Sequence, residues 1–221
     1  MTELTLQELL DRDAIYMTLA RRAFGVDRRD WELVSSGYAP DAVADYYGTI
    51  RNGRDAIVWA IQGVRQYEQT THFLGNQLIN VQGNKAQVET YATAYHRRGP
   101  EEPLSDLIKG LRYRHEMERQ DGDWVMTKET LVADWIRDEV VRDAGAIPPE
   151  RKPGHQAPMF PRGAGLDYLL EKAAIEDHLS RYYQAVDRRD YATVLATYTP
   201  DAVVWYRDLK CEGTEEILAR V

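Results

Sequence analysis

The pentapeptide Val26-Asp27-Arg28-Arg29-Asp30 occurs again, letter for letter, as Val186-Asp187-Arg188-Arg189-Asp190. The same spacing of 160 residues aligns Pro40-Asp41-Ala42-Val43 with Pro200-Asp201-Ala202-Val203. Chance does not keep one register over roughly fifty residues without a gap, so the chain contains an internal duplication. The second copy stops where the chain stops, inside a predicted helix, which favours truncation of a longer protein.

Composition limits the classes of partner and compartment. The chain has 221 residues, of which 43% are hydrophobic, enough for a packed core. Its net charge of −8 and pI near 5.2 argue against nucleic acid or an anionic membrane as the main partner. The lone Cys211 excludes an internal disulfide and a thiolate metal cluster. The polar segment Met1–Asp11 is neither a signal peptide nor a membrane span, so a cytoplasmic protein is expected.

Helical spacing of apolar residues predicts the first half of the leading copy. An amphipathic helix is expected over Leu6–Phe24, and Asp30 is expected to cap a short helix over Trp31–Gly37. A turn at Pro40-Asp41 then precedes a strand over Ala42–Tyr47. A tight turn at Asn52-Gly53 leads into a third helix, Arg54–Tyr67.

Long strands with short turns follow the helices. They are predicted at Phe73–Val81, Lys85–Arg97, Leu107–Arg119 and Trp124–Trp135. Glycine-containing turns between them indicate an antiparallel meander. Helices followed by a meander are typical of an α+β fold in which helices cover one face of a curved sheet and enclose a pocket. The predicted organisation is a domain over 1–144, a Pro/Gly-rich linker over 145–165 and an incomplete second repeat over 166–221.

The order of these motifs resembles a known family. Val-Asp-Arg-Arg-Asp-Trp, Tyr-Ala-Pro-Asp-Ala-Val, Gly-Arg-Asp-Ala-Ile, Thr-His-Phe-Leu-Gly-Asn and Asp-Gly-Asp-Trp-Val are similar to the SnoaL-like branch of the nuclear transport factor 2-like superfamily. The resemblance covers about Leu4 to Ile136 and implies a cone-shaped α+β fold with an apolar pocket, commonly dimeric. The superfamily includes scytalone dehydratase, bile-acid dehydratase and hexachlorocyclohexane dehydrochlorinase, and also non-catalytic subunits.

The resemblance implies a catalytic pair. Asp27 matches a family carboxylate at the end of the first helix, and His72 matches a histidine at the start of a sheet strand. A carboxylate that holds one imidazole nitrogen raises the basicity of the other, which suits removal of a proton next to a leaving group. No metal or organic cofactor is then needed. The alternative is that Asp27 caps the helix near Asp30 and that His72 is an ordinary polar residue at a strand start.

Further candidates surround this pair. His96 is at a place comparable to a second histidine of scytalone dehydratase, and alternation puts Ala92 and Ala94 on the same face, where their small side chains leave space for substrate. The alternative for His96 is a solvent-exposed strand end. Tyr46 matches a tyrosine that donates to substrate in the same relative. Tyr47 is its neighbour, and either tyrosine is compatible with simple core packing.

Arg22 is a departure from the family, because relatives have tyrosine or lysine there. It could stabilise an anion in the pocket, although pairing with an acidic residue on the helix surface is favoured. The dehydrochlorinase carries an arginine near the position of Lys128-Glu129, which weakens a dehalogenase interpretation.

The sequence therefore predicts a cofactor-independent lyase or isomerase, a dehydratase foremost, acting on a small hydrophobic cyclic or aromatic molecule. A carbon–carbon lyase could use the same pair. The alternative is a non-catalytic ligand-binding or subunit-assembly module. A homodimer is expected through the outer face of the sheet, on which Glu89, Tyr91, Thr93 and Tyr95 alternate with the pocket residues.

Overall fold

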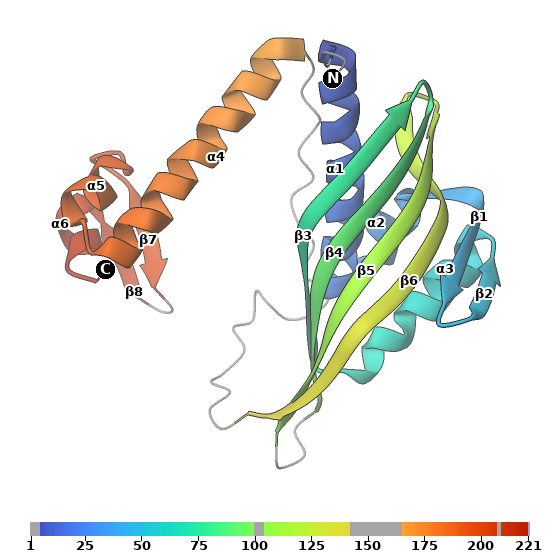
Figure 1. The fold of residues 1–221 in the computed structure, drawn as a ribbon. Coiled ribbons are helices and arrows are strands. Elements are labelled where there is room, and N and C mark those ends of the chain that lie inside the picture. Colours follow the sequence, from blue (N-terminus) through green and yellow to red (C-terminus); the bar gives the residue numbers. More distant parts are fainter. Residues whose placement is uncertain (1–4, 100–103, 142–164, 207–208, 221) are drawn as a thin grey trace. The chain divides into compact units, whose positions relative to one another are not determined.

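The chain folds into two compact units, Met1–Phe160 and Pro161–Val221. The structure is a computed structural model and describes residues 5–99, 104–141, 165–206 and 209–220 (Figure 1). The predicted linker over 145–165 lies, apart from its last residue, outside the described residues. Among the described helices, none is long and apolar enough to cross a membrane.

The repeated pentapeptide ends one helix and starts the next. Helix α1, Leu6–Arg28, runs four residues beyond its prediction and ends at Arg29, which has a left-handed backbone with φ 57°. Asp30 then caps α2, Trp31–Ser36, by accepting a hydrogen bond of 3.0 Å from the backbone N–H of Leu33. Side-chain capping directly after a left-handed residue fixes the corner between the two helices.

A six-stranded sheet forms the body of the first unit. Its strand order is β2-β1-β6-β5-β4-β3. The bounds are Tyr38–Tyr46 for β1, Thr49–Asn52 for β2, Gln69–Gln82 for β3, Lys85–Arg97 for β4, Ser105–Gln120 for β5 and Asp123–Val140 for β6. Strands β3 to β6 form the predicted antiparallel meander. The sheet as a whole is mixed, because β1 joins β6 in parallel.

Three local predictions around β1 and α3 were wrong. Pro40-Asp41 lies inside β1, where a register shift between Tyr38 and Val43 absorbs the proline in place of a turn. Strand β2 was missed, since it pairs with β1 through the two-residue turn at Tyr47 and Gly48. The third helix is shorter than predicted: α3 covers Arg54–Ile61, and a 3-10 turn, η1, continues over Gln62–Gln66.

Alternation along β4 separates the two faces of the sheet as predicted. Its even-numbered residues from Ala86 to His96 are buried, whereas Tyr91 and Tyr95 are exposed. Helix α1 contacts β3 and β6, and α3 contacts β1, so the helices cover the buried face (Figure 1). The core between them contains Ile15, Val34, Ile57, Trp124 and Met126. This arrangement confirms the predicted α+β fold with helices packed on a curved sheet.

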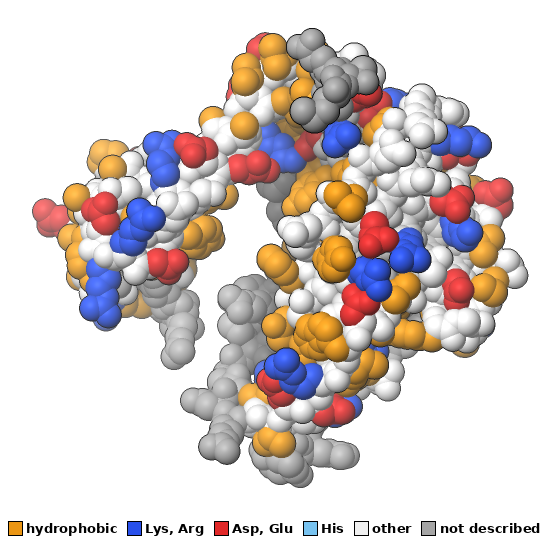
Figure 2. Space-filling view, in the orientation of Figure 1, with side chains coloured by type: hydrophobic (Ala, Val, Ile, Leu, Met, Phe, Trp, Pro, Cys, Tyr) orange, Lys and Arg blue, Asp and Glu red, His pale blue; other side chains and the backbone are white. Residues whose placement is uncertain are grey.

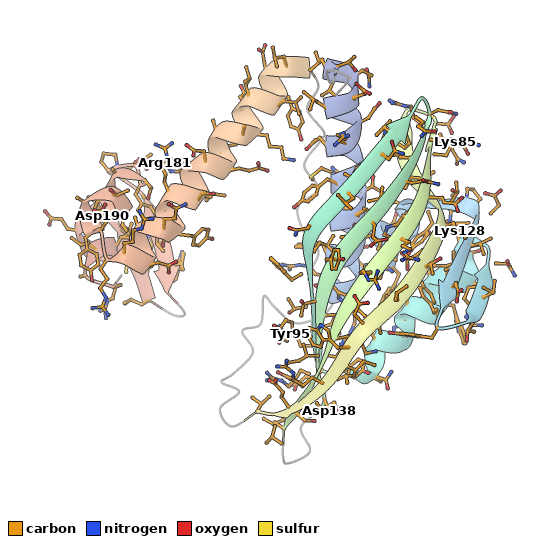
Figure 3. The ribbon with its side chains drawn as sticks, in the orientation of Figure 1. Lys85, Tyr95, Lys128, Asp138, Arg181 and Asp190 are labelled. Carbon is orange, nitrogen blue, oxygen red and sulfur yellow. The ribbon has the colours of Figure 1, made fainter. Side chains whose placement is uncertain are left out.

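The second unit repeats the start of the first. Its elements are α4 Gly165–Arg188, α5 Tyr191–Ala196, β7 Val203–Tyr206, β8 Leu209–Glu212 and α6 Gly213–Leu218. They follow the order α1, α2, β1, β2, α3, and Asp190, which is labelled in Figure 3, caps α5 as Asp30 caps α2. Gly53 and Gly213 both have positive φ, 85° and 78°. Each donates a backbone hydrogen bond of 2.8 Å, to Ala42 and to Ala202 respectively. The described part of this unit contains no equivalent of β3 to β6.

Candidate active site

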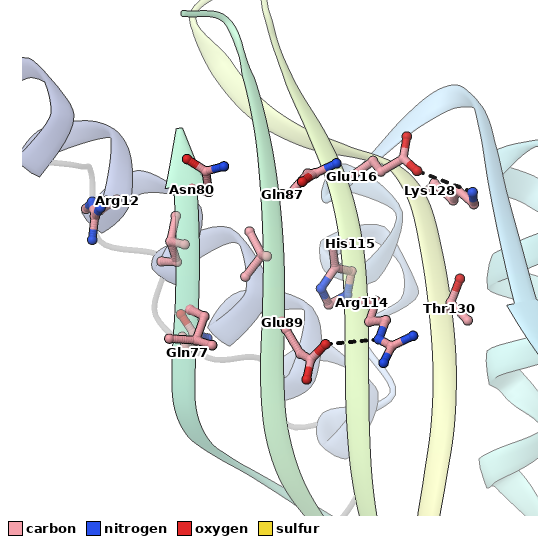
Figure 4. A pocket seen from close by; sticks show the side chains of 13 residues that line it. Arg12, Gln77, Asn80, Gln87, Glu89, Arg114, His115, Glu116, Lys128 and Thr130 are labelled. Carbon is pink, nitrogen blue, oxygen red and sulfur yellow. Dashed lines mark hydrogen bonds and ion pairs between the residues drawn. The ribbon is translucent and has the colours of Figure 1, made fainter. Parts of the chain in front are cut away.

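A cavity of about 260 Å³ lies between the end of α1, the hairpin of β1 and β2, η1 and the sheet. Most of the predicted site residues line it. Its polar lining includes Arg22, Tyr46, Tyr47, His72, His96 and Lys109. A larger hollow of about 740 Å³ runs along another part of the sheet (Figure 4). None of the predicted site residues lines that hollow, and four of its charged side chains form two ion pairs, Arg114–Glu89 at 2.9 Å and Lys128–Glu116 at 3.2 Å.

The predicted carboxylate–histidine pair is present. His72 Nδ1 lies 2.6 Å from Asp27 Oδ1. Asp27 also accepts hydrogen bonds from the backbone N–H of His72 at 2.8 Å and from the Thr70 hydroxyl at 2.9 Å. Three donors fix the carboxylate, and the carboxylate in turn holds the proton of His72 on Nδ1. The Nε2 atom is therefore the free base. Because Asp30 is the residue that caps α2, the capping role considered for Asp27 is wrong.

His96 is the second imidazole of the cavity. It is 5% exposed, so the alternative of a solvent-exposed strand end is wrong. Its ring is edge-on to that of His72, with 5.6 Å between centroids. Nδ1 lies 3.1 Å from the carbonyl oxygen of Leu107, to which it donates. Burial, and after it the neighbouring His72, lowers the pKa of His96 to about 4. His96 is thus neutral at pH 7, with Nε2 as a hydrogen-bond acceptor.

A buried ionic network forms the wall behind the cavity. The Glu129 carboxylate, 0% exposed, accepts hydrogen bonds from Arg22 at 2.7 Å, from Tyr38 and Tyr46 at 2.8 Å each, and from His115 at 3.1 Å. Burial alone would raise the pKa of Glu129, but Arg22 and then His115 outweigh it, and the pKa falls to about 2. The favoured surface pairing of Arg22 was therefore wrong. Arg22 is 6% exposed and is neutralised within the core.

The two tyrosines both line the cavity, for different reasons. The Tyr46 hydroxyl donates its proton to Glu129, so it can only accept a hydrogen bond from a ligand, and the expected donor role is blocked while that bond stands. Burial, followed by Glu129, raises the pKa of Tyr46 well above its ordinary value. Tyr47 has φ 58° and Gly48 has φ 84°, as in a two-residue hairpin turn. This turn interrupts strand alternation and brings both side chains to the cavity.

The predicted space around the alanines is filled. Ala92 and Ala94 are buried, but they pack with Leu111 and Tyr113 and do not line the cavity. Sequence reasoning also missed Lys109, Glu129 and the stacking of Arg22 over Tyr113, with 5.0 Å from guanidinium carbon to ring centroid. Alternation along β5 was the available signal, because Lys109, Leu111 and Tyr113 share one face and all line the cavity.

The cavity therefore holds an oriented base and a neutral acceptor, in front of a wall whose ionic groups are satisfied. Among the described residues, no three His, Cys, Asp or Glu side chains converge in an arrangement that could hold a metal ion. What the arrangement can do with its own groups is remove a proton from a small bound molecule and return it.

The fold and the sequence define the class of protein. The SnoaL-like domain family matches residues 7–130 and 167–221, in both units. The chain belongs to this family.

Individual relatives are similar over part of the chain. Terrestric acid biosynthesis cluster protein E from Penicillium crustosum is 37% identical over 133 residues, which are 58% of this chain and 85% of the relative. A proposed scytalone dehydratase from Novosphingobium aromaticivorans has a TM-score of 0.55 at 24% identity, covering 68% of this chain and 97% of the other. A hexachlorocyclohexane dehydrochlorinase from Novosphingobium barchaimii has a TM-score of 0.54 at 20% identity, covering 65% and 99%. These solved structures share the fold.

Proposed function

We propose that the protein is a cofactor-independent lyase, foremost a dehydratase, or an isomerase that acts on a small hydrophobic cyclic or aromatic molecule. The observation that carries this proposal is the 2.6 Å contact between His72 Nδ1 and Asp27 Oδ1 at the wall of the cavity. It leaves Nε2 of a carboxylate-supported imidazole as the base. The relative from Penicillium crustosum, named for a biosynthesis cluster, supports conversion of a small molecule.

The chemistry follows from a single base. His72 Nε2 takes a proton from the carbon next to the one that bears a hydroxyl group. The electron pair of the broken C–H bond becomes the new double bond, and the C–O bond breaks. The departing hydroxide takes the proton back from the imidazolium and leaves as water. In an isomerase the same nitrogen would return the proton to a different carbon. Asp27 stabilises the transient imidazolium in either case.

The lining indicates the size and polarity of the substrate. A cavity of about 260 Å³ lies just below the ~300 Å³ lower end for typical ligand pockets, so the substrate is small. Val26, Leu111 and Leu131 supply apolar wall. His96 Nε2 offers an acceptor for a substrate hydroxyl, and Tyr46 offers a second. A ring that carries a hydroxyl group and an activated C–H bond satisfies these groups.

A substrate screen tests the proposal. Purified protein is incubated with cyclic and aromatic alcohols and ketones. Chromatography coupled to mass spectrometry then detects either the loss of one water molecule or a change in retention time at constant mass. We expect one class to be converted by the wild-type protein and not by His72→Ala. Conversion by both proteins would exclude His72 as the base.

A non-catalytic ligand-binding module is the second candidate. Asp27 ties α1 to β3 through Thr70 and the backbone of His72, and these two bonds would serve a purely structural purpose equally well. Binding of a small ring without conversion of any member of the screen, by wild type and by His72→Ala alike, would favour this reading.

A further inference from the structure

Lys109 lines the cavity with a positive charge that, unlike that of Arg22, has no carboxylate partner among the described residues. It lies on β5 between the neighbours Ala94 of β4 and Ile136 of β6. Its side chain is on the same face of β5 as Leu111 and Tyr113, and it lines the cavity together with His72 and His96. Its ammonium nitrogen is 5.9 Å from the ring centroid of Tyr47. Its positive charge also contributes to the lowered pKa of His96, so the two groups are close enough to interact.

The charge balance of the cavity leaves Lys109 without an anionic partner among the described residues. Arg22 is paired with Glu129, and Asp27 is occupied by His72 and Thr70. No ion pair or hydrogen bond links the Lys109 ammonium to any residue in the described part of the chain. Partial burial lowers the pKa of Lys109, as expected of a cation that lacks compensation. The carboxylates of Asp27 and Glu129 do not line the cavity, because their partners lie between them and it. Lys109 lines the cavity itself.

We propose that Lys109 binds an anionic oxygen of the substrate, a carboxylate or an ionised enol, next to the carbon whose proton His72 removes. The identity of that carbon rests on the proposed function. The binding of an anion by Lys109 is inferred from the cavity alone. It narrows the substrate from a neutral hydrophobic ring to an acidic one. Lys109 is then a substrate-binding residue that orients the ring between the two imidazoles.

A half-buried ammonium group without a counter-ion is energetically costly. An anion at Lys109 replaces the hydration that the cavity wall removes, and the charge-assisted hydrogen bond is stronger than one to a neutral oxygen. The hydroxyl of Tyr46 and Nε2 of His96 cannot compete for the same anion, because each presents only an acceptor. A ligand with its anion at Lys109 and its hydroxyl at His96 satisfies the ammonium group and the free imidazole nitrogen together.

Calorimetric titration of the full chain with matched probes tests the proposal without turnover. Benzoate is compared with benzamide, and 4-hydroxycoumarin, ionised at neutral pH, with coumarin. The first pair probes a carboxylate and the second an enol. We expect at least one acid to bind about tenfold to a hundredfold more tightly than its neutral counterpart. Lys109→Met should abolish that preference, and Lys109→Arg should retain it in part.

Lys128→Met is the matched control, because Lys128 is paired with Glu116 and lies outside the cavity. It should leave the preference unchanged. Equal binding of acid and neutral probe by the wild type, no binding of either acid, or a preference that survives Lys109→Met would each overturn the proposal. Loss of turnover in Lys109→Met at unchanged anion affinity would also contradict it. His72→Ala separates the two claims, since it should keep the anion preference even if the proposed lyase activity is wrong.

Discussion

Replacing Glu129 by glutamine should destabilise the first unit strongly. The pKa of this carboxyl falls from 4.5 to about 2, because Arg22, then His115 and Tyr38, outweigh its burial. At about 1.36 kcal/mol for each tenfold change in a proton equilibrium, that lowering corresponds to about 3 kcal/mol of stability. Removing one member of a buried ion pair typically costs about 3 to 5 kcal/mol, because the other charge stays uncompensated. We therefore expect Glu129→Gln to lose about 3 to 5 kcal/mol.

Urea unfolding followed by circular dichroism measures the change. Glu116→Gln is the matched control on the neighbouring strand, since its exposed pair with Lys128 should contribute less than about 1 kcal/mol. A loss in Glu129→Gln as small as that of Glu116→Gln would refute the buried network. A double-mutant cycle with Arg22→Met should give a coupling free energy of more than about 1 kcal/mol, because the two side chains are in direct contact.

The pH dependence provides an independent check of the same group. A carboxyl whose pKa is lowered on folding contributes stability that is fully present above its unfolded pKa and is lost as pH falls through the folded pKa. For Glu129 this window runs from 4.5 down to about 2. The pKa of His96 is lowered from 6.5 to about 4, so this residue adds a loss of stability as the pH falls from 6.5 to about 4. Glu129→Gln should lack the component below pH 4.5 and keep that of His96, whereas an unchanged profile would contradict the assignment.

Three further predictions concern the site and the surfaces. Tyr46→Phe removes a donor from Glu129 and should cost about 1 kcal/mol or more of stability while impairing turnover only through positioning; a loss as large as that of the base would show a direct chemical role. Deletion of residues 161–221 should leave turnover intact in a folded variant, because every residue that lines the cavity belongs to the first unit; loss of turnover with ligand binding retained would contradict this. We also propose a homodimer through the exposed face of the sheet, on which Tyr91 and Tyr95 are exposed. Figure 2 shows hydrophobic side chains among charged ones on the surface of the protein. Sedimentation should show a dimer that Tyr91→Glu dissociates, and a monomeric wild type would count against it.

Much of the fold was predictable because its periodicity is strong. The bounds of β4 were predicted to the residue, and the ends of α1 and of the other long strands within a few residues, since alternation and helical spacing persist over many residues. The errors fall where tertiary context decides. Proline in β1 is tolerated at a register shift, and the parallel pairing of β1 with β6 joins residues far apart in the sequence, such as Val43 with Lys128, which no local pattern specifies.

The site was predictable where a motif carried it. The resemblance pointed to Asp27 and His72, which the structure joins, and alternation turned His96 inward. Glu129 was missed because a charged residue is expected to be exposed, and its burial depends on four donors that converge from α1, β1 and β5. The role of Lys109 was missed for a similar reason. A lysine near a strand end ordinarily reaches solvent, whereas Lys109 lines the cavity.

The most direct test of the central claim is the turnover number of His72→Ala on the substrate that the screen identifies. Loss of a general base should lower it by roughly two to four orders of magnitude. Asp27→Asn, which keeps the shape but loses the charge that supports the imidazolium, should lower turnover more than affinity. His178 is an exposed histidine of the second unit whose ring donates a hydrogen bond to the Thr197 carbonyl oxygen, and His178→Ala should match the wild type. Full turnover by a folded His72→Ala variant would contradict the account.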